Sequence, residues 1–342
     1  MEAINETKQV KPDKTRELEP DILRSAALLY IIGFWHLSEY AAPHTFPERL
    51  TSGLVTYGVL GIFCFISGYL LTKHTRFHYP RQILHFYQKR WVRVYPMYLL
   101  TLTLFLSLNL IDGRTYLKSF FATNMIYYEP VMTLWFVSLI LTLYLLLPLY
   151  VYRYSLSRTV FLTLGLSLLF WLIATSGLPW IDHRLPLFLP IFVLGIMAAK
   201  HSSVYRLIRQ PWFVLICACV LVALVALGAN LPQEPLAKFT IVYGVMAISI
   251  PAYYGLAGGL AKLNISSFLP FLTYSSFAAY LIHRIVFHFG VLVYQPLTPV
   301  SSWLYLVFFL LPLTLVLGYF YQKMYDFIVS TKKPGFLKKP GF

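Results

Sequence analysis

The sequence predicts an all-α fold: a polytopic transmembrane helical bundle of about ten spans with both termini in the cytoplasm. The 342 residues are 58% hydrophobic and only 12% charged, more apolar surface than a soluble domain of this size can hide. Apolar runs near the bilayer-crossing length of about 20 residues recur along the chain at 22–42, 53–72, 94–111, 131–151, 159–176, 185–199, 211–229, 239–258, 267–294 and 303–324.

The basic residues indicate the orientation, because the cytoplasmic loops of membrane proteins carry an excess of Lys and Arg. With a cytoplasmic N-terminus, five of the 28 Lys and Arg residues fall in outer loops, Arg284 falls in a span, and the other 22 are cytoplasmic. The run at 185–199 is short and contains Pro186 and Pro190. We therefore expect it to be tilted, kinked or only partly inserted, and the span count to lie between nine and eleven.

Three parts are expected: a cytoplasmic tail at 1–20, a transmembrane domain at 21–326, and a basic cytoplasmic tail at 327–342. The net charge of +15 is juxtamembrane, so it predicts contact with anionic inner-leaflet lipids and not with nucleic acid. The three cysteines all lie in spans, where they are expected to pack as small apolar residues. The sequence has no metal-ligand spacing, and no metal is expected.

The first apolar run, ILRSAALLYIIGFWHLSEY, contains an ionisable residue, His36. Such residues are costly in hydrocarbon; they usually face a bundle interior and serve function. His36 lies twelve residues after Arg24, about 18 Å deeper along a helix, and Glu39 follows on the same helical face. An imidazole backed by a carboxylate suits general-base catalysis. The alternatives are a polar pair bonding between helices and a proton relay in a transporter.

The connection between the second and third expected spans is strongly basic and reads KHTRFHYPRQILHFYQKRWVRVYP. Within it, Arg90 and Arg93 are three residues apart, so both guanidinium groups project from one helical face at the cytoplasmic surface. Guanidinium forks suit phosphate groups. The alternative is ordinary positive-inside topology, which explains most of these charges by itself.

Other polar and aromatic residues in apolar runs are weaker candidates. His283 is a second intramembrane imidazole, and Arg284 is expected to snorkel or to pair with an acid on a neighbouring helix. Trp135 either lines an acceptor path or belongs to an interfacial aromatic belt. Ser67, with Gly68, either contacts substrate or permits close helix packing. One cluster in an expected outer loop either touches a glycan or is solvated: Asp182, His183 and Arg184.

Six segments, in this order, resemble motifs of the acyltransferase family 3 membrane proteins, the integral-membrane O-acyltransferases of surface glycans. The resemblance covers nearly the whole chain, and the Arg-x-x-Arg-hydrophobic-Tyr-Pro segment is its most specific match. The segments are LRSAALLYIIGFWH, YGVLGIFCFISGYLLTKH, FYQKRWVRVYPMY, LWFVSLILTLYLLLP, FLPIFVLGIMAAK and LTYSSFAAYLIHRIV.

The chain also departs from the family pattern. Eleven residues separate Arg24 from His36, where the family usually has ten, and Ile140 stands where many members carry Glu. Some members have a fused periplasmic hydrolase-like domain that passes the acyl group onward. This sequence shows none, so we expect transfer to the acceptor directly or to a separate envelope partner.

The resemblance implies transfer of an acyl group, acetyl by preference, from cytosolic acyl-coenzyme A to a hydroxyl of a cell-surface glycan such as an exopolysaccharide, lipopolysaccharide or peptidoglycan. It implies a bacterial inner-membrane protein with no permanently bound cofactor. Arg90, Arg93 and Arg24 are assigned to coenzyme A, and His36 with Glu39 to catalysis. Three residues are assigned to substrate binding: His283, Trp135 and Ser67. The main alternative is a transporter or flippase for a glycan or lipid-linked intermediate, and another is a non-catalytic partner of a polysaccharide synthase.

Overall fold

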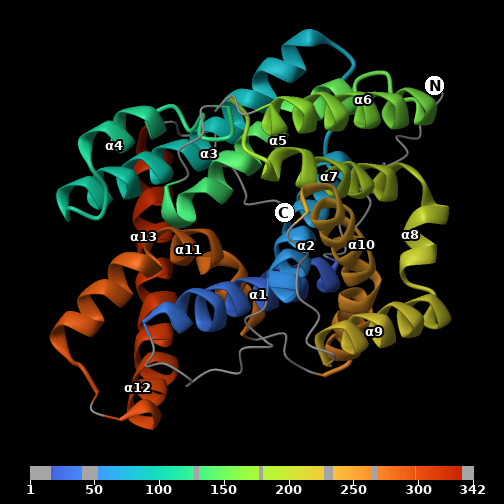
Figure 1. Cartoon of the computed structure of the whole chain (residues 1–342). Helices are drawn as coiled ribbons and strands as arrows, with labels where there is room; N and C mark the ends of the chain where they lie inside the picture. Colours follow the sequence, from blue (N-terminus) through green and yellow to red (C-terminus); the bar gives the residue numbers. More distant parts are fainter. Residues whose placement is uncertain are drawn as a thin grey trace, which may run out of the picture.

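The computed structural model describes residues 17–40, 53–126, 131–176, 180–226, 234–263, 268–296 and 298–332, and the regular structure in these ranges is entirely helical (Figure 1). The expected all-α class is confirmed. The helices are α1 (Leu18–Tyr30), α2 (Gly53–Lys73), α3 (Pro80–Ser107), α4 (Gly113–Ser119), α5 (Trp135–Val151), α6 (Leu156–Thr175), α7 (Arg184–Lys200), α8 (Ser202–Ile208), α9 (Pro211–Ala226), α10 (Pro235–Leu260), α11 (Leu269–Val293), α12 (Pro299–Tyr305) and α13 (Leu311–Lys332).

Each expected span coincides with a helix, but not every helix meets the length and apolarity of a membrane crossing. Among the described residues, six helices do so alone: Gly53–Lys73, Met132–Val151, Leu156–Thr175, Leu236–Leu260, Leu269–Val293 and Val300–Val329. The α7–α8 pair, bent by 114°, makes a seventh if it is counted as one span. The chain is therefore a multi-pass membrane protein, and the count of ten stays a prediction.

The first helix changes its winding as it approaches His36. After α1, a π-helical turn η1 covers Ile31–His36, and a 3₁₀ turn η2 covers Leu37–Glu39. A π turn is wider than an α turn and a 3₁₀ turn is tighter, so the angular spacing of side chains differs from that of a straight α-helix. This change of register decides which side chains reach the bundle interior.

The closest helix packing lies between α2 and α7, and α10 packs against α2 (Figure 1). A Cβ added at Gly68 would lie 2.1 Å from the carbonyl oxygen of Phe192. A Cβ added at Gly195 would lie 2.1 Å from that of Phe65. These glycines let the two backbones touch, as small residues do between membrane helices, and the packing interpretation of Gly68 is confirmed.

A second group of helices, α11 and α13, packs together on the other side of α1, which also contacts α2 and α10. The outer helix α6 has a different character: of its residues only Thr159 is buried, and Phe161 and Leu164 are 75% and 63% exposed. Apolar side chains on this outward face suit lipid contact. The first helix therefore has the two helical groups on either side of it, and His36 is carried at its far end.

Candidate active site

Two buried histidines, distant in the sequence, meet inside the bundle. His36 ends the π-helical turn η1 and is 7% exposed, and His283 on α11 is fully buried. Their rings are stacked, with centroids 4.7 Å apart and planes inclined by 7°. The structure thus joins two residues that the sequence could only single out separately.

Each imidazole in the pair has a buried nitrogen without a hydrogen-bond partner among the described residues. Nδ1 of His283 lies 2.6 Å from the carbonyl oxygen of Tyr280. Because a carbonyl oxygen only accepts, Nδ1 is the protonated nitrogen and Nε2 keeps its lone pair. Nε2 of His283 and Nδ1 of His36 are the two unpartnered atoms. Such buried polar atoms are costly unless something supplied later, such as a ligand, satisfies them.

Glu39 lies in a different place from the one expected. Arg284 on α11 holds its carboxylate with two hydrogen bonds, from Nη1 to Oε2 at 2.5 Å and from Nη2 to Oε1 at 2.9 Å. Within the described residues no hydrogen bond or ion pair joins this carboxylate to His36, so the expected direct backing of His36 by Glu39 is not observed, and a catalytic role for Glu39 stays a prediction. The expected pairing of Arg284 with an acid on another helix is confirmed.

Tyr280, one turn before His283 on the same face of α11, connects the histidines to the 3₁₀ turn η3 (Met132–Leu134) that precedes α5. Its hydroxyl donates to the carbonyl oxygen of Thr133 at 2.5 Å, and its ring centroid lies 6.5 Å from that of His36. The Oγ1 of Thr133 is buried without a hydrogen-bond partner. Neither residue was among those predicted from the sequence, although the i, i+3 spacing of Tyr280 and His283 was a usable signal.

A second polar cluster lies at the start of α7. Asp182 is fully buried, and its Oδ1 accepts a hydrogen bond from the backbone N–H of Arg184 at 2.8 Å. Nη1 of Arg184 lies 3.5 Å from Oδ2 of Asp182, and both atoms are buried without a hydrogen-bond partner. The Arg184 guanidinium lies over the Trp135 ring, 4.2 Å from its centroid.

This cluster is linked to Tyr280 by ring contacts. Arg184 lies over Trp135, whose ring centroid is 5.6 Å from that of Phe136, and the Phe136 centroid is 6.1 Å from that of Tyr280. We call five buried side-chain atoms, which have no hydrogen-bond partner among the described residues, the polar row; they belong to Asp182, Arg184, Thr133, His283 and His36. Its atoms come from four helical segments and from the connection just before α7. A molecule with several hydroxyl groups, each both donor and acceptor, is well suited to satisfy such a row.

The three arginines assigned to coenzyme A form a cluster of their own. Burial, followed by the charge of Arg90, lowers the pKa of Arg93 to about 10, and the charge of Arg24 acts in the same direction. Arg93 therefore stays charged at neutral pH. Tyr144 on α5 acts electrostatically on both Arg90 and Arg93. The three arginines assigned to coenzyme A thus lie near one another, although Arg24 comes from α1 and the others from α3.

Two further expectations concern Ser67 and metal binding. Ser67 is half-buried on α2 beside Gly68, and no hydrogen bond joins it to the histidine pair within the described ranges. Those ranges also contain no group of three or more His, Cys, Asp or Glu residues that could hold a metal ion. Neither observation connects Ser67 or a metal to the candidate site.

Two buried imidazoles, each with a nitrogen that has no hydrogen-bond partner among the described residues, suit proton transfer inside a membrane helical bundle. Comparison with known families agrees with this class: a model of the acyltransferase 3 domain matches residues 17–322. The match covers most of the chain, which therefore belongs to the acyltransferase 3 family and is a membrane acyltransferase. Comparison with curated proteins and with solved structures finds no match.

Proposed function

We propose that this membrane acyltransferase moves an acyl group, acetyl by preference, from acyl-coenzyme A to a hydroxyl of a cell-surface glycan. The observation that carries the proposal is the stacked pair of His36 and His283, each with a buried nitrogen that has no hydrogen-bond partner. Hydroxyl groups need a base before they attack a thioester at a useful rate. An unpartnered imidazole nitrogen is suited to that task.

The donor site is assigned to the arginine cluster. Coenzyme A carries several phosphates, and guanidinium forks bind phosphate with charge-assisted hydrogen bonds. Arg90 and Arg93 project from α3, and Arg24 lies near Arg93. His36 is twelve residues beyond Arg24, about 18 Å along the helix. The pantetheine arm of coenzyme A would extend from the arginines toward the histidines.

The chemical step is acyl transfer with the histidines as proton carriers. His36 takes the proton of the acceptor hydroxyl through its unpartnered nitrogen while the oxygen attacks the thioester carbonyl carbon. The carbon–sulfur bond then breaks, the coenzyme A thiolate leaves, and His36 returns the proton to the sulfur. His283 offers Nε2 as an acceptor to orient the hydroxyl. Arg284, held by Glu39, has a buried Nε without a partner and can donate to the developing oxyanion.

The acceptor is assigned to the end of the helical bundle opposite the arginine cluster, which is expected to face outward. The polar row runs from Asp182 and Arg184 to the histidine pair, and Trp135 adds an aromatic surface beneath Arg184. Sugars present many hydroxyl groups and apolar ring faces, which match polar groups beside an aromatic ring. The exopolysaccharide, lipopolysaccharide and peptidoglycan alternatives all stay open, as does a separate envelope protein that passes the acyl group on. Ser67 stays a weaker candidate for this site.

This assignment requires a specific topology. We propose about ten spans in a bacterial inner membrane with both termini in the cytoplasm, so that acyl-coenzyme A reaches the arginines and the glycan reaches the outer loops. The asymmetry of the basic residues supports this orientation. Among the described residues, six helices are long enough to cross alone, and the bent α7–α8 pair makes a seventh if it is counted as one span, which sets a lower bound on the span count.

Purified protein in lipid nanodiscs tests the proposal with radiolabelled acetyl-coenzyme A and surface glycan isolated from the host. Label should pass to the glycan, and His36→Gln should abolish this transfer. Uptake of glycan without transfer would favour the transporter or flippase alternative. Retained glycan synthesis in cells that carry His36→Gln, with no transfer by wild type, would favour the scaffold alternative.

A further inference from the structure

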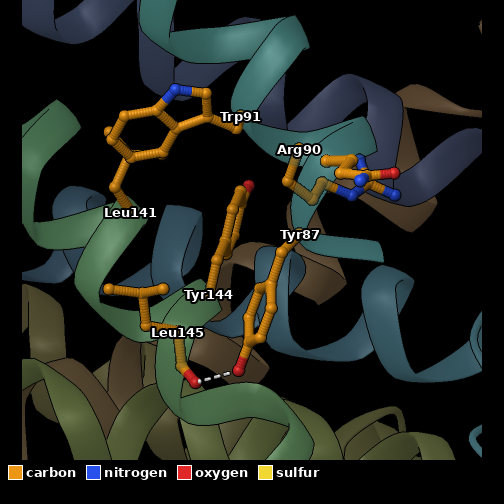
Figure 2. A pocket seen from close by; sticks show the side chains of 7 residues that line it. Tyr87, Arg90, Trp91, Leu141, Tyr144 and Leu145 are labelled. Atoms are coloured by element: carbon orange, nitrogen blue, oxygen red, sulfur yellow. Dashed lines mark hydrogen bonds between the residues drawn. The ribbon is translucent and has the colours of Figure 1, made fainter. Parts of the chain in front are cut away.

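A pocket of about 250 Å³ opens between α3 and α5, next to Arg90. Three aromatic rings and two leucines line most of it, as Figure 2 shows. The hydroxyl of Tyr87 donates to the carbonyl oxygen of Leu145 at 2.8 Å, which fixes that ring against α5. The lining residues are Tyr87, Gln88, Arg90, Trp91, Leu141, Tyr144 and Leu145.

The pocket and the cationic cluster share a residue. Arg90 lines the pocket, and its Nε is buried without a hydrogen-bond partner among the described residues. Tyr144 contributes its ring to the pocket and acts electrostatically on both Arg90 and Arg93. An apolar aromatic cavity and a site for anionic groups therefore share a wall.

We propose that this pocket holds the adenine base of the acyl-coenzyme A donor, with Arg90 and Arg93 on its phosphates. A flat aromatic base stacks on aromatic side chains, and a nucleotide carries its phosphates on the ribose attached to that base. This inference rests on the proposed function and extends it, because it makes the nucleotide end of the donor, and not only its phosphates, a determinant of binding.

The placement also fits the reach of the donor. Arg24 lies near Arg93, and His36 is twelve residues further along the first helix, about 18 Å away. A base held beside Arg90 leaves the pantetheine arm free to extend along that helix toward the histidine pair. A lipid chain would match the apolar walls but would leave the buried Nε of Arg90, which has no hydrogen-bond partner among the described residues, unsatisfied.

The test compares two donors on the nanodisc-embedded protein. Acetyl-coenzyme A carries the base, and acetyl-pantetheine lacks it. Tyr144→Ala should raise the KM for acetyl-coenzyme A by about ten- to a hundredfold, the range that stacking of a base on an aromatic side chain contributes. The KM for acetyl-pantetheine should stay unchanged. Tyr144→Phe keeps the ring and should retain most of the affinity. Trp212→Ala, an exposed tryptophan on α9, is the matched control.

The other possible results also test the assignment of the pocket to the base. If Tyr144→Ala raises the KM for both donors equally, or for neither, the pocket does not hold the base. If the KM for acetyl-coenzyme A is unchanged and the activity depends differently on lipid composition, the pocket is assigned to a lipid chain. Binding of adenosine bisphosphate tests the pocket apart from the reaction. Nucleotide that binds wild type and not Tyr144→Ala, in a protein that transfers no acyl group, would retain this inference and overturn the proposed function. Absence of nucleotide binding to wild type would overturn this inference.

Discussion

At the residue scale, substitution of His36 distinguishes a catalytic role of this side chain from a structural one. His36→Gln keeps a side chain that can hydrogen-bond but has no basic nitrogen. We expect it to lower kcat for transfer by about 10²–10⁴-fold, the usual contribution of a general base, while the affinity for acetyl-coenzyme A is retained. Single-turnover transfer in nanodiscs measures the first quantity and donor binding the second. Near-normal transfer by His36→Gln would refute the assignment and make His283 the next candidate.

A second prediction concerns Arg93 of the donor cluster. A hydrogen bond to a charged group typically contributes about 1.5–3 kcal/mol. Arg93→Ala should therefore raise the KM for acetyl-coenzyme A by roughly ten- to a hundredfold. Arg93→Lys should recover only part of the loss because it lacks the guanidinium fork. Arg209→Ala, at an arginine that already pairs with Glu19, is the control. Unchanged donor affinity in the double variant of Arg90 and Arg93 would contradict the site.

The outer cluster gives a third prediction. Asp182→Asn keeps an oxygen that can accept from the backbone of Arg184 but removes the charge facing the guanidinium. We expect the KM for glycan to rise by about tenfold or more, the scale of a lost charged hydrogen bond, with hydrolysis of acetyl-coenzyme A unaffected. Asp112→Asn is a matched control, since Asp112 accepts from the backbone of Thr115 at the start of α4. An equal effect of both variants would assign Asp182 to structure alone.

The residues of the site could be found from the sequence only one at a time. His36, His283 and Arg284 were visible because ionisable groups in apolar runs are rare. Their arrangement was not visible, because stacking of His36 on His283 needs the contact between the first helix and α11. The partner of Glu39 was not visible either, because its pairing with Arg284 also needs the contact between the first helix and α11.

At the element scale, the contact of α2 with α7 can be tested through its glycines. Gly68→Ala or Gly195→Ala would place a Cβ 2.1 Å from a backbone oxygen of the other helix, which cannot move as a side-chain end can. Overpacking of this kind typically costs about 1–3 kcal/mol, so the thermal midpoint in detergent should fall by several degrees. Gly165→Ala on α6, with nothing within 4 Å of its added Cβ, should leave it unchanged. Equal midpoints for all three variants would show that the helices separate freely.

Helix positions were largely predictable because apolar runs of membrane length dominate the sequence. Each expected span overlaps a helix, and the short run with Pro186 and Pro190 became α7, which bends by 114° into α8. Helix ends were less predictable. The α3 helix begins at Pro80, well before the expected 94, since its basic first half is helical without being apolar. Similarly, α13 continues to Lys332, inside the expected tail at 327–342.

At the scale of the whole molecule, the proposed sites lie in a fixed order along the first helix. The cationic cluster near Arg24 comes first and the histidine pair at His36 follows, with the polar row leading from the pair to Asp182. A donor and an acceptor that approach from opposite sides would meet at the histidines without sharing an entrance. This order has functional meaning only if the arginines face the cytosol and the start of α7 faces outward.

The orientation therefore gives the last prediction. His78 is exposed in the connection between α2 and α3, where basic residues indicate the cytoplasmic side. In a variant whose three native cysteines are replaced by serine, His78→Cys should resist a membrane-impermeant thiol reagent in intact cells and react after permeabilisation. Arg114→Cys, exposed at the start of α4 in an expected outer loop, should react in both conditions. The reverse pattern would invert the topology, turn the arginine cluster away from cytosolic acyl-coenzyme A, and remove the physical basis of the donor site.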